Sequence, residues 1–270
     1  MTLRPASRGG PGLKGGNGCA RRRGNTFINN GIQASFTQDT SSNLTFKFLN
    51  NGTAAVPMTG SILQAVNVFS SSQATGGTIV GTISGNRIGN PAVAGSAGGG
   101  GAISAVIQGQ TDATLLIDGN IVRQTSGDAR AIGVAFRGPA PPLATSLGAN
   151  TVVNDLTITN NDVVPGSAPS GFPLSAIMVE ADNQTGADNK APTVRADIRS
   201  NTLPNATVFD LLSTNIGFYE YDAAGGHGIG QLVDTPPASA DATGQLTSTN
   251  TGSASAFGIA LIPGPIRVPP

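Results

Sequence analysis

Four acidic residues in the second half of the chain are the residues best suited to do chemistry. Glu180-Ala-Asp182 and Glu220-Tyr-Asp222 share one spacing, and these two glutamates are the only ones in the sequence. Each pair follows a short apolar segment. Aligning Ala176-Ile-Met-Val with Ile216-Gly-Phe-Tyr places Glu180 under Glu220 and Asp182 under Asp222. We therefore expect the four carboxylates to lie close together.

Carboxylates in that arrangement favour one of three outcomes. Like charges this close disfavour joint ionisation, so the cluster would retain a proton or bind a hard cation, and Ca²⁺ prefers oxygen ligands. Two carboxylates about 5–5.5 Å apart would instead suit retaining glycoside hydrolysis. If the strands simply end and turn into solvent, the charges lie apart. Ca²⁺, held by Glu180, Asp182, Glu220 and Asp222, is the only cofactor that the sequence suggests.

Other catalytic constellations are missing from the sequence. His227 is the only histidine, which excludes zinc sites with several histidines and leaves one possible base for a Ser-His-Asp triad. A lone histidine in a Gly-rich segment is typical of a surface loop, and no serine lies in a G-x-S-x-G elbow. The sequence therefore names no catalytic residue.

A repeated asparagine indicates how the strands that carry these residues are arranged. It follows a short apolar segment each time, as in Ile117-Asp-Gly-Asn120, at intervals of 35, 34, 41 and 40 residues. Asparagine tolerates the left-handed conformation of sharp turns, and a stacked amide can bond the amides above and below it. A turn that recurs at this period predicts stacked coils. The expected column, or ladder, consists of Asn51, Asn86, Asn120, Asn161 and Asn201.

A second repeat lies between the asparagines and gives each coil another strand. Ile132-Gly-Val-Ala-Phe136 and Phe257-Gly-Ile-Ala-Leu261 share an apolar-Gly-apolar frame, and a short third strand can follow the asparagine, as at Ile121-Val122. The sequence thus predicts an all-β, right-handed parallel β-helix of about seven coils. The connections after the second set lengthen toward the C-terminus. The segment from Asp222 to Gln245 is the longest expected loop, and such insertions project from one side of a solenoid.

Composition and charge divide the chain into three parts. Residues 1–24 hold six basic residues and no acid, whereas residues 25–270 hold nine basic and fifteen acidic residues, a net charge of −6. We expect residues 1–25 to be a disordered tail or a mis-assigned start, residues 26–262 to form the β-helix, and residues 263–270 to form a Pro-rich tail. A mildly acidic body excludes a nucleic-acid-binding face, and no segment is long and apolar enough for a transmembrane helix.

The repeat, apolar-x-[Gly/Asn/Ser]-Asn-x-apolar alternating with Gly-x-apolar strands, resembles that of bacterial right-handed parallel β-helix proteins. It is most similar to secreted or surface repeat proteins and autotransporter-like passengers, over about residues 26–262. The fold also houses polygalacturonases and pectate lyases. The polygalacturonase motif set is broken here, whereas Arg137 with the acidic residues resembles the acidic calcium ligands and arginine of pectate lyases.

The resemblance implies a non-catalytic, secreted or cell-surface bacterial module. It would be stalk- or adhesin-like, bind a glycan or extracellular matrix through loops on one side, and form part of a longer polypeptide. The alternative is a polysaccharide-active enzyme, a lyase or glycoside hydrolase, that uses the carboxylate cluster. Few aromatic or basic residues are available to such an enzyme for a sugar-binding groove, since the chain has two tyrosines, no tryptophan and three lysines.

Overall fold

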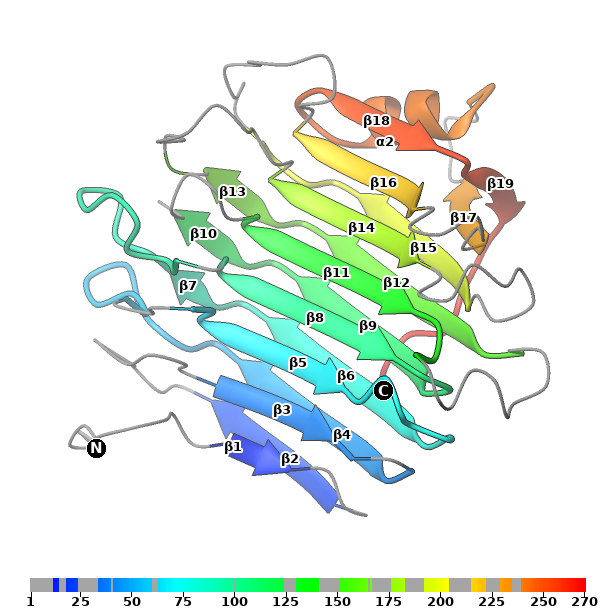
Figure 1. Cartoon of the computed structure of the whole chain (residues 1–270). Helices are drawn as coiled ribbons and strands as arrows, with labels where there is room; N and C mark the ends of the chain where they lie inside the picture. Colours follow the sequence, from blue (N-terminus) through cyan, green and yellow to red (C-terminus); the bar gives the residue numbers. More distant parts are fainter. Residues whose placement is uncertain are drawn as a thin grey trace.

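A computed structural model gives the arrangement of the chain (Figure 1). For residues 12–14, 18–23 and 221 only the backbone is described. The described residues are 12–14, 18–23, 34–39, 41–59, 63–99, 101–123, 130–140, 151–164, 166, 176–182, 192–203, 215–221, 229–234 and 239–270.

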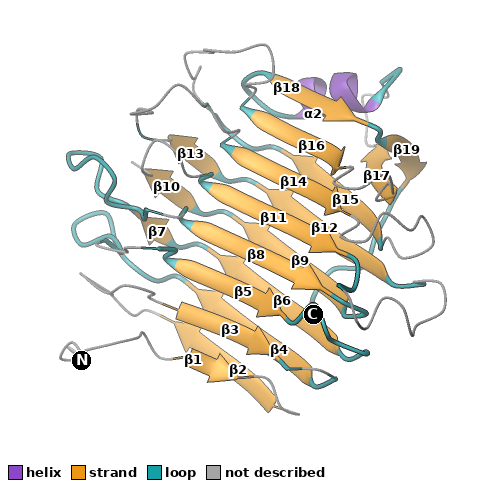
Figure 2. Cartoon of the chain, in the orientation of Figure 1, coloured by secondary structure: helices purple, strands orange, loops and turns teal. Residues whose placement is uncertain are grey.

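Two eight-stranded parallel sheets face each other along the molecule (Figure 2). The strands alternate between the sheets along the chain, so each strand pairs with the strand one coil away. Sheet A contains β1 (Gly12–Lys14), β3 (Ala34–Gln38), β5 (Val66–Ser70), β8 (Ile103–Gln108), β11 (Ile132–Arg137), β14 (Ile177–Asp182), β16 (Ile216–Tyr221) and β18 (Ala254–Phe257). Sheet B contains β2 (Gly18–Arg23), β4 (Asn43–Leu49), β6 (Thr78–Ser84), β9 (Asp112–Asp118), β12 (Val153–Thr159), β15 (Thr193–Arg199), β17 (Ile229–Asp234) and β19 (Ala260–Pro263).

A short third sheet closes one side of the molecule. Sheet C consists of β7 (Arg87–Ile88), β10 (Ile121–Arg123) and β13 (Asp162–Val164), all parallel. The chain is therefore all-β with parallel sheets, consistent with a parallel β-solenoid. Each large sheet has eight strands, one more than the number of coils expected from the repeat.

The core lies between the sheets and follows from strand alternation. Successive side chains of a strand point to opposite faces, so one face of each strand supplies apolar residues to the interior. In β4, for example, Leu44, Phe46 and Phe48 are buried. Phe36 of β3 stacks on Phe46 with ring centroids 4.0 Å apart and meets Phe48 edge-on. Parallel sheets need such coverage on their inner face.

The predicted asparagine stacking is present at the corner between sheets B and C. From Asn86 onward, each Oδ1 accepts the backbone N–H and the side-chain Nδ2 of the asparagine one coil before it, as Asn120 does for Asn86 at 3.1 and 2.9 Å. The Nδ2 of each of these asparagines also donates to a strand carbonyl, that of Ile83 in the case of Asn120. The column contains Asn51, Asn86, Asn120, Asn161 and Asn201, all at most 1% exposed.

The residue before each ladder asparagine takes the left-handed conformation that we had expected of the asparagine itself. Its φ is positive at Asn50, Gly85, Gly119, Asn160 and Ser200, with values from 53° to 68°. The ladder asparagines are not among the residues of positive φ. The motif therefore divides its roles, because the Gly/Asn/Ser position makes the turn while the following asparagine supplies the hydrogen bonds.

The column continues past the five predicted asparagines to a sixth, Asn250. Its Oδ1 accepts the N–H and the Nδ2 of Asn201, both at 2.9 Å. Asn250 follows a helix, α2 (Ala242–Thr249), so it has no apolar strand before it to reveal the motif. Asp241 caps α2 by accepting the N–H of Gly244, and Ala242 and Leu246 join the core.

Regular elements lie in two segments for which the sequence predicts a tail or a loop. The expected tail of residues 1–25 contains β1 and β2, which pair with β3 and β4. The expected loop from Asp222 to Gln245 contains β17 and the start of α2. Both segments are glycine-rich or polar, so their own sequences do not predict strands, and the pairing comes from neighbouring strands.

The C-terminal residues return along the outer face of sheet B (Figure 1). Arg267 binds Asp112 of β9 and the fully buried Asp155 of β12, and Lys47 of β4 donates to the carbonyl of Pro270. Hydrogen bonding to Asp112 raises the pKa of Arg267 above its usual value, with a smaller contribution from Asp155 and despite opposition from burial. The expected Pro-rich tail thus binds across several strands.

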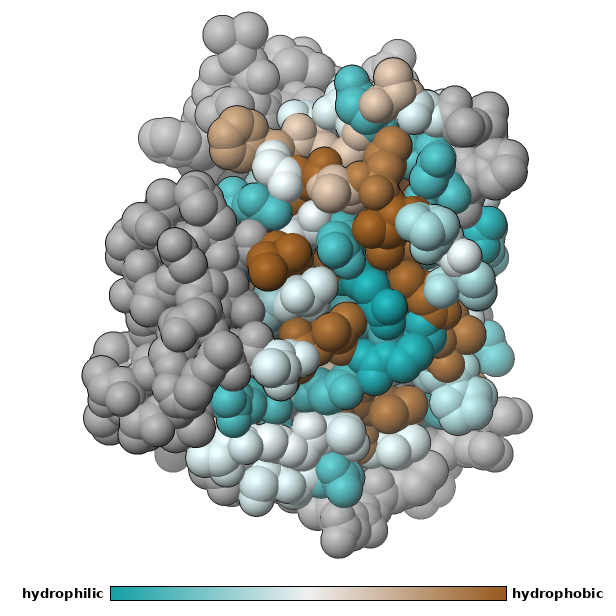
Figure 3. Space-filling view, turned by 90° about the vertical axis from the view of Figure 1, so that its right-hand side faces the viewer, coloured by the Kyte–Doolittle hydropathy of each residue, from teal (hydrophilic) through white to brown (hydrophobic). Residues whose placement is uncertain are grey.

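Among the described residues, no helix has the length and apolar character of a membrane span. Figure 3 shows the side of the molecule at which sheet A strands turn toward sheet B, where hydrophilic residues lie between apolar ones.

Candidate functional site

The structure separates the two glutamates that the sequence placed together. β14 pairs with β16 so that Glu180 lies opposite Tyr219 and Ala181 lies opposite Glu220. This register differs by one residue from the expected one, and a one-residue shift sends every side chain to the other face of the strand. The core sets the register, because Ile177 and Val179 align with Ile216 and Phe218.

Glu180 and Glu220 therefore lie in different surroundings. Ala181, opposite Glu220, is fully buried in the core, and Glu220 Oε1 accepts the N–H of Gly230 in sheet B at 2.9 Å. Glu180 lies on the outer face of sheet A. The expected stacking of Glu180 on Glu220 is wrong, whereas Asp222 and His227 lie outside the described residues.

Glu180 and Asp182 instead form a charged cluster with two arginines. Arg130 Nη2 lies 2.7 Å from Glu180 Oε1, and Arg137 reaches Glu180 Oε2 at 4.0 Å and Asp182 Oδ2 at 3.4 Å. Both carboxylate side chains are only 11% exposed. Arg137 is paired in register with Asp182 across β11 and β14. The arginine noted beside the acidic residues in the sequence is thus in contact with two of them.

Arg130 was missed by sequence analysis. Arg130 precedes β11, and its side chain lies along that strand over Gly133, which has no side chain. A Cβ at Gly133 would lie only 3.3 Å from Arg130 Cδ. With two arginines and two carboxylates the cluster has no net charge. Within the described part of the chain, no group of three or more His, Cys, Asp or Glu side chains could hold a metal ion. Calcium binding therefore stays a prediction.

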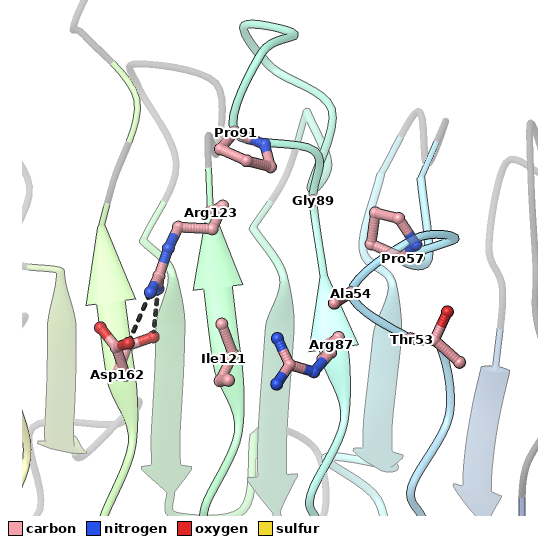
Figure 4. A pocket seen from close by; sticks show the side chains of 9 residues that line it. All are labelled: Thr53, Ala54, Pro57, Arg87, Gly89, Pro91, Ile121, Arg123 and Asp162. Carbon is pink, nitrogen blue, oxygen red and sulfur yellow. Dashed lines mark hydrogen bonds and ion pairs between the residues drawn. The ribbon is translucent and has the colours of Figure 1, made fainter.

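Sheet C forms the second candidate site, a groove that we call the sheet C groove. It is lined by Arg87, Ile121, Arg123 and Asp162 together with Thr53 and Pro91, and encloses a cavity of about 370 Å³ (Figure 4). Ile121 is paired with Arg87 on one side and Asp162 on the other, so these three residues form one outward row. Ile88, Val122 and Val163 alternate with them and are buried.

The two arginines of the groove differ in their partners. Arg123 donates through Nη1 to the carbonyl of Asp162 at 2.8 Å and through Nη2 to its carboxylate. Within the described part of the chain, the guanidinium of Arg87 makes no hydrogen bond or ion pair. In Figure 4 the Arg87 side chain extends along the cavity toward Ile121. Among the described residues, the groove therefore presents one positive charge that no ion pair balances.

Sequence analysis missed this groove, although a signal was present. Arg87, Ile121 and Asp162 each follow a ladder asparagine directly, and residues at one position of a repeat stack in one column.

Scanned against protein-family models, the chain matches none, and searches among curated proteins and solved structures likewise give no match. The resemblance to bacterial β-helix proteins therefore rests on the repeat pattern, and the parallel sheets are compatible with it.

Proposed function

We propose that this chain is a non-catalytic binding module, built as a right-handed parallel β-helix, that presents the side containing sheet C to a glycan or matrix partner. The observation that carries the proposal is the guanidinium of Arg87, which has no ion-pair or hydrogen-bond partner among the described residues and lies in a preformed cavity. A concave site with a few placed polar groups is the usual form of a small-ligand site. Right-handedness is expected because parallel strands joined by crossovers are almost always right-handed.

The scaffold supports this role. Arg87 donates its backbone N–H to Asn51 and accepts from Met58, each at 2.9 Å, and the neighbouring Asn86 is part of the ladder. The strand that carries Arg87 is thus held on both sides before any partner arrives. Binding then requires ordering of little more than one side chain, which lowers its entropic cost.

Location at a cell surface or outside the cell belongs to the same proposal. A stalk- or adhesin-like module works by holding a binding surface in a fixed place, and stacked coils do this by lengthening in one direction. The side with the sequence-predicted loops lies largely outside the described residues, so the proposal rests on the sheet C side.

A polysaccharide-active enzyme is the alternative, and one observation favours it. Glu180 and Asp182 are largely buried carboxylates beside Arg137. An enzyme of this kind would use one carboxylate as acid or base on a bound sugar. In the binding module the same four charges only stabilise the outer face of sheet A.

Binding and cleavage assays on a panel of neutral and acidic polysaccharides distinguish the binding module from the enzyme. We expect retention of the protein by at least one polysaccharide, and no new reducing or unsaturated chain ends, with and without Ca²⁺. Melting curves in Ca²⁺ add a test of metal binding, since an ion that binds the folded state raises stability by RT ln(1 + [L]/Kd). Turnover that Glu180→Gln abolishes would replace the binding module by the enzyme.

A further inference from the structure

We infer that the sheet C groove binds the carboxylate of a single acidic sugar unit, with Arg87 as the residue that binds the anion. The inference rests on the proposed function for the class of partner, and it adds the chemical group, the residue and the size of the ligand. Arg87, Arg123 and Asp162 together leave the groove with a net charge of +1.

The positive charge of Arg87 favours an anionic ligand, and the planar guanidinium favours a planar anionic group. Arg123 is already paired with Asp162, so the positive charge available to a ligand is that of Arg87. A guanidinium offers a planar pair of N–H donors that matches the two oxygens of a carboxylate. Because the site is partly enclosed, such a charge-assisted pair is screened less than one on an open surface.

The remaining lining suits a ring that bears hydroxyl groups. Asp162 offers carboxylate oxygens that accept hydrogen bonds, and Thr53 carries a hydroxyl at the rim. Ile121 lies in the strand row between Arg87 and Asp162 and supplies an apolar surface for the C–H face of a ring. A cavity of about 370 Å³ is near the lower limit of ligand pockets, about 300 Å³, which suits a single sugar ring.

The spacing of the lining residues also sets the orientation of a bound sugar acid. Arg87 and Asp162 lie on strands two apart, with β10 between them. Adjacent strands are about 4.8 Å apart, so the two outer residues of the row lie roughly 10 Å apart at the backbone. A sugar acid can then place its carboxylate on Arg87 while its hydroxyls face Asp162 and Arg123. A bare carboxylate would use only the first of these contacts.

Calorimetric titration of the intact protein with D-glucuronate, D-glucose and acetate tests the inference. We expect D-glucuronate to bind more tightly than either of the others, since glucose lacks the anion and acetate lacks the ring. Binding should weaken as salt is raised. Arg87→Gln should weaken D-glucuronate binding by about tenfold or more, the usual effect of losing a charge-assisted hydrogen bond.

Arg199→Gln is the matched control, because Arg199 is a half-exposed arginine of sheet B that does not line the groove. It should leave D-glucuronate binding unchanged, and both variants should keep the wild-type melting transition. Equal binding of glucuronate and acetate, or full binding by Arg87→Gln, would overturn the inference. If polysaccharide retention then persists, the proposed function stands without it. If retention fails while Arg87-dependent glucuronate binding holds, the proposed function fails instead.

Discussion

Asn86 Nδ2 donates to Asn120 Oδ1 at 2.9 Å, although the two residues are 34 positions apart in the chain. The same Oδ1 accepts the backbone N–H of Asn86 at 3.1 Å, so one side chain joins two successive coils twice. Water cannot replace these contacts, because both residues are fully buried. The ladder is therefore part of the structure that holds the sheet C groove in place.

Asn120→Ala should lower the free energy of unfolding by roughly 3–5 kcal/mol. It leaves the N–H and Nδ2 of Asn86 without an acceptor and the carbonyl of Ile83 without its donor, and each unsatisfied buried group costs about 1–3 kcal/mol. Chemical denaturation measures the change. Asn67→Ala is the control, since Asn67 has one long contact to Ser35, and its cost should stay within about 0.5 kcal/mol. Equal losses of unfolding free energy in both variants would show that the ladder does not stabilise the fold as described.

Gly89→Ala should destabilise the fold more than Gly119→Ala. Both glycines have positive φ, so each substitution costs about 1–2 kcal/mol of backbone strain. A Cβ at Gly89 would also lie 1.7 Å from the backbone oxygen of Arg123, whereas Gly119 has nothing within 4 Å of such an atom. The expected difference is about 1–3 kcal/mol in unfolding free energy. Similar losses at both sites would show that β7 and β10 do not approach as described.

Asp155→Ala should cost roughly 2–4 kcal/mol. Asp155 is fully buried and accepts two hydrogen bonds from Arg195, at 2.7 and 2.8 Å, in addition to its contact with Arg267. Breaking a buried pair costs about 3–5 kcal/mol, and the loss is smaller here because both arginines can reach water. Asp162→Ala, which removes a 42% exposed carboxylate from its ion pair, should cost less than about 1 kcal/mol. The C-terminal segment should also become more accessible to proteases in Asp155→Ala only.

Asp197→Asn should change the dependence of stability on pH. Burial raises the pKa of Asp197 above its ordinary value of 3.8, although Arg199 opposes the shift. In the wild type the contribution of this group is therefore greatest below pH 3.8 and is lost as pH rises through the raised pKa. The variant lacks this titration, so its stability relative to wild type should increase across that range and stay level above it. Denaturation curves from pH 3 to 7 measure the difference, and an unchanged or falling difference contradicts the assignment.

The sequence predicted the repeat better than it predicted the site. The ladder asparagines were found because a residue that must occupy one corner of every coil has a fixed pattern of neighbours. Asn250 escaped because α2 replaces the apolar strand before it. Glu180 and Glu220 were misplaced by one residue, since their apolar neighbours fit two registers and only packing across the core chooses between them. The pairing of Arg130 with Glu180 has no local signal, because it joins residues from different coils.

Affinity electrophoresis through gels that contain pectate tests whether this chain binds an acidic glycan. The chain length of the pectate, measured before and after incubation with the protein, tests whether the glycan is cleaved. Dextran gels serve as the neutral control. We expect slower migration in pectate than in dextran, loss of that retardation in Arg87→Gln, and pectate of unchanged length with or without Ca²⁺. Equal migration in both gels, or shortening of the pectate, would contradict this expectation.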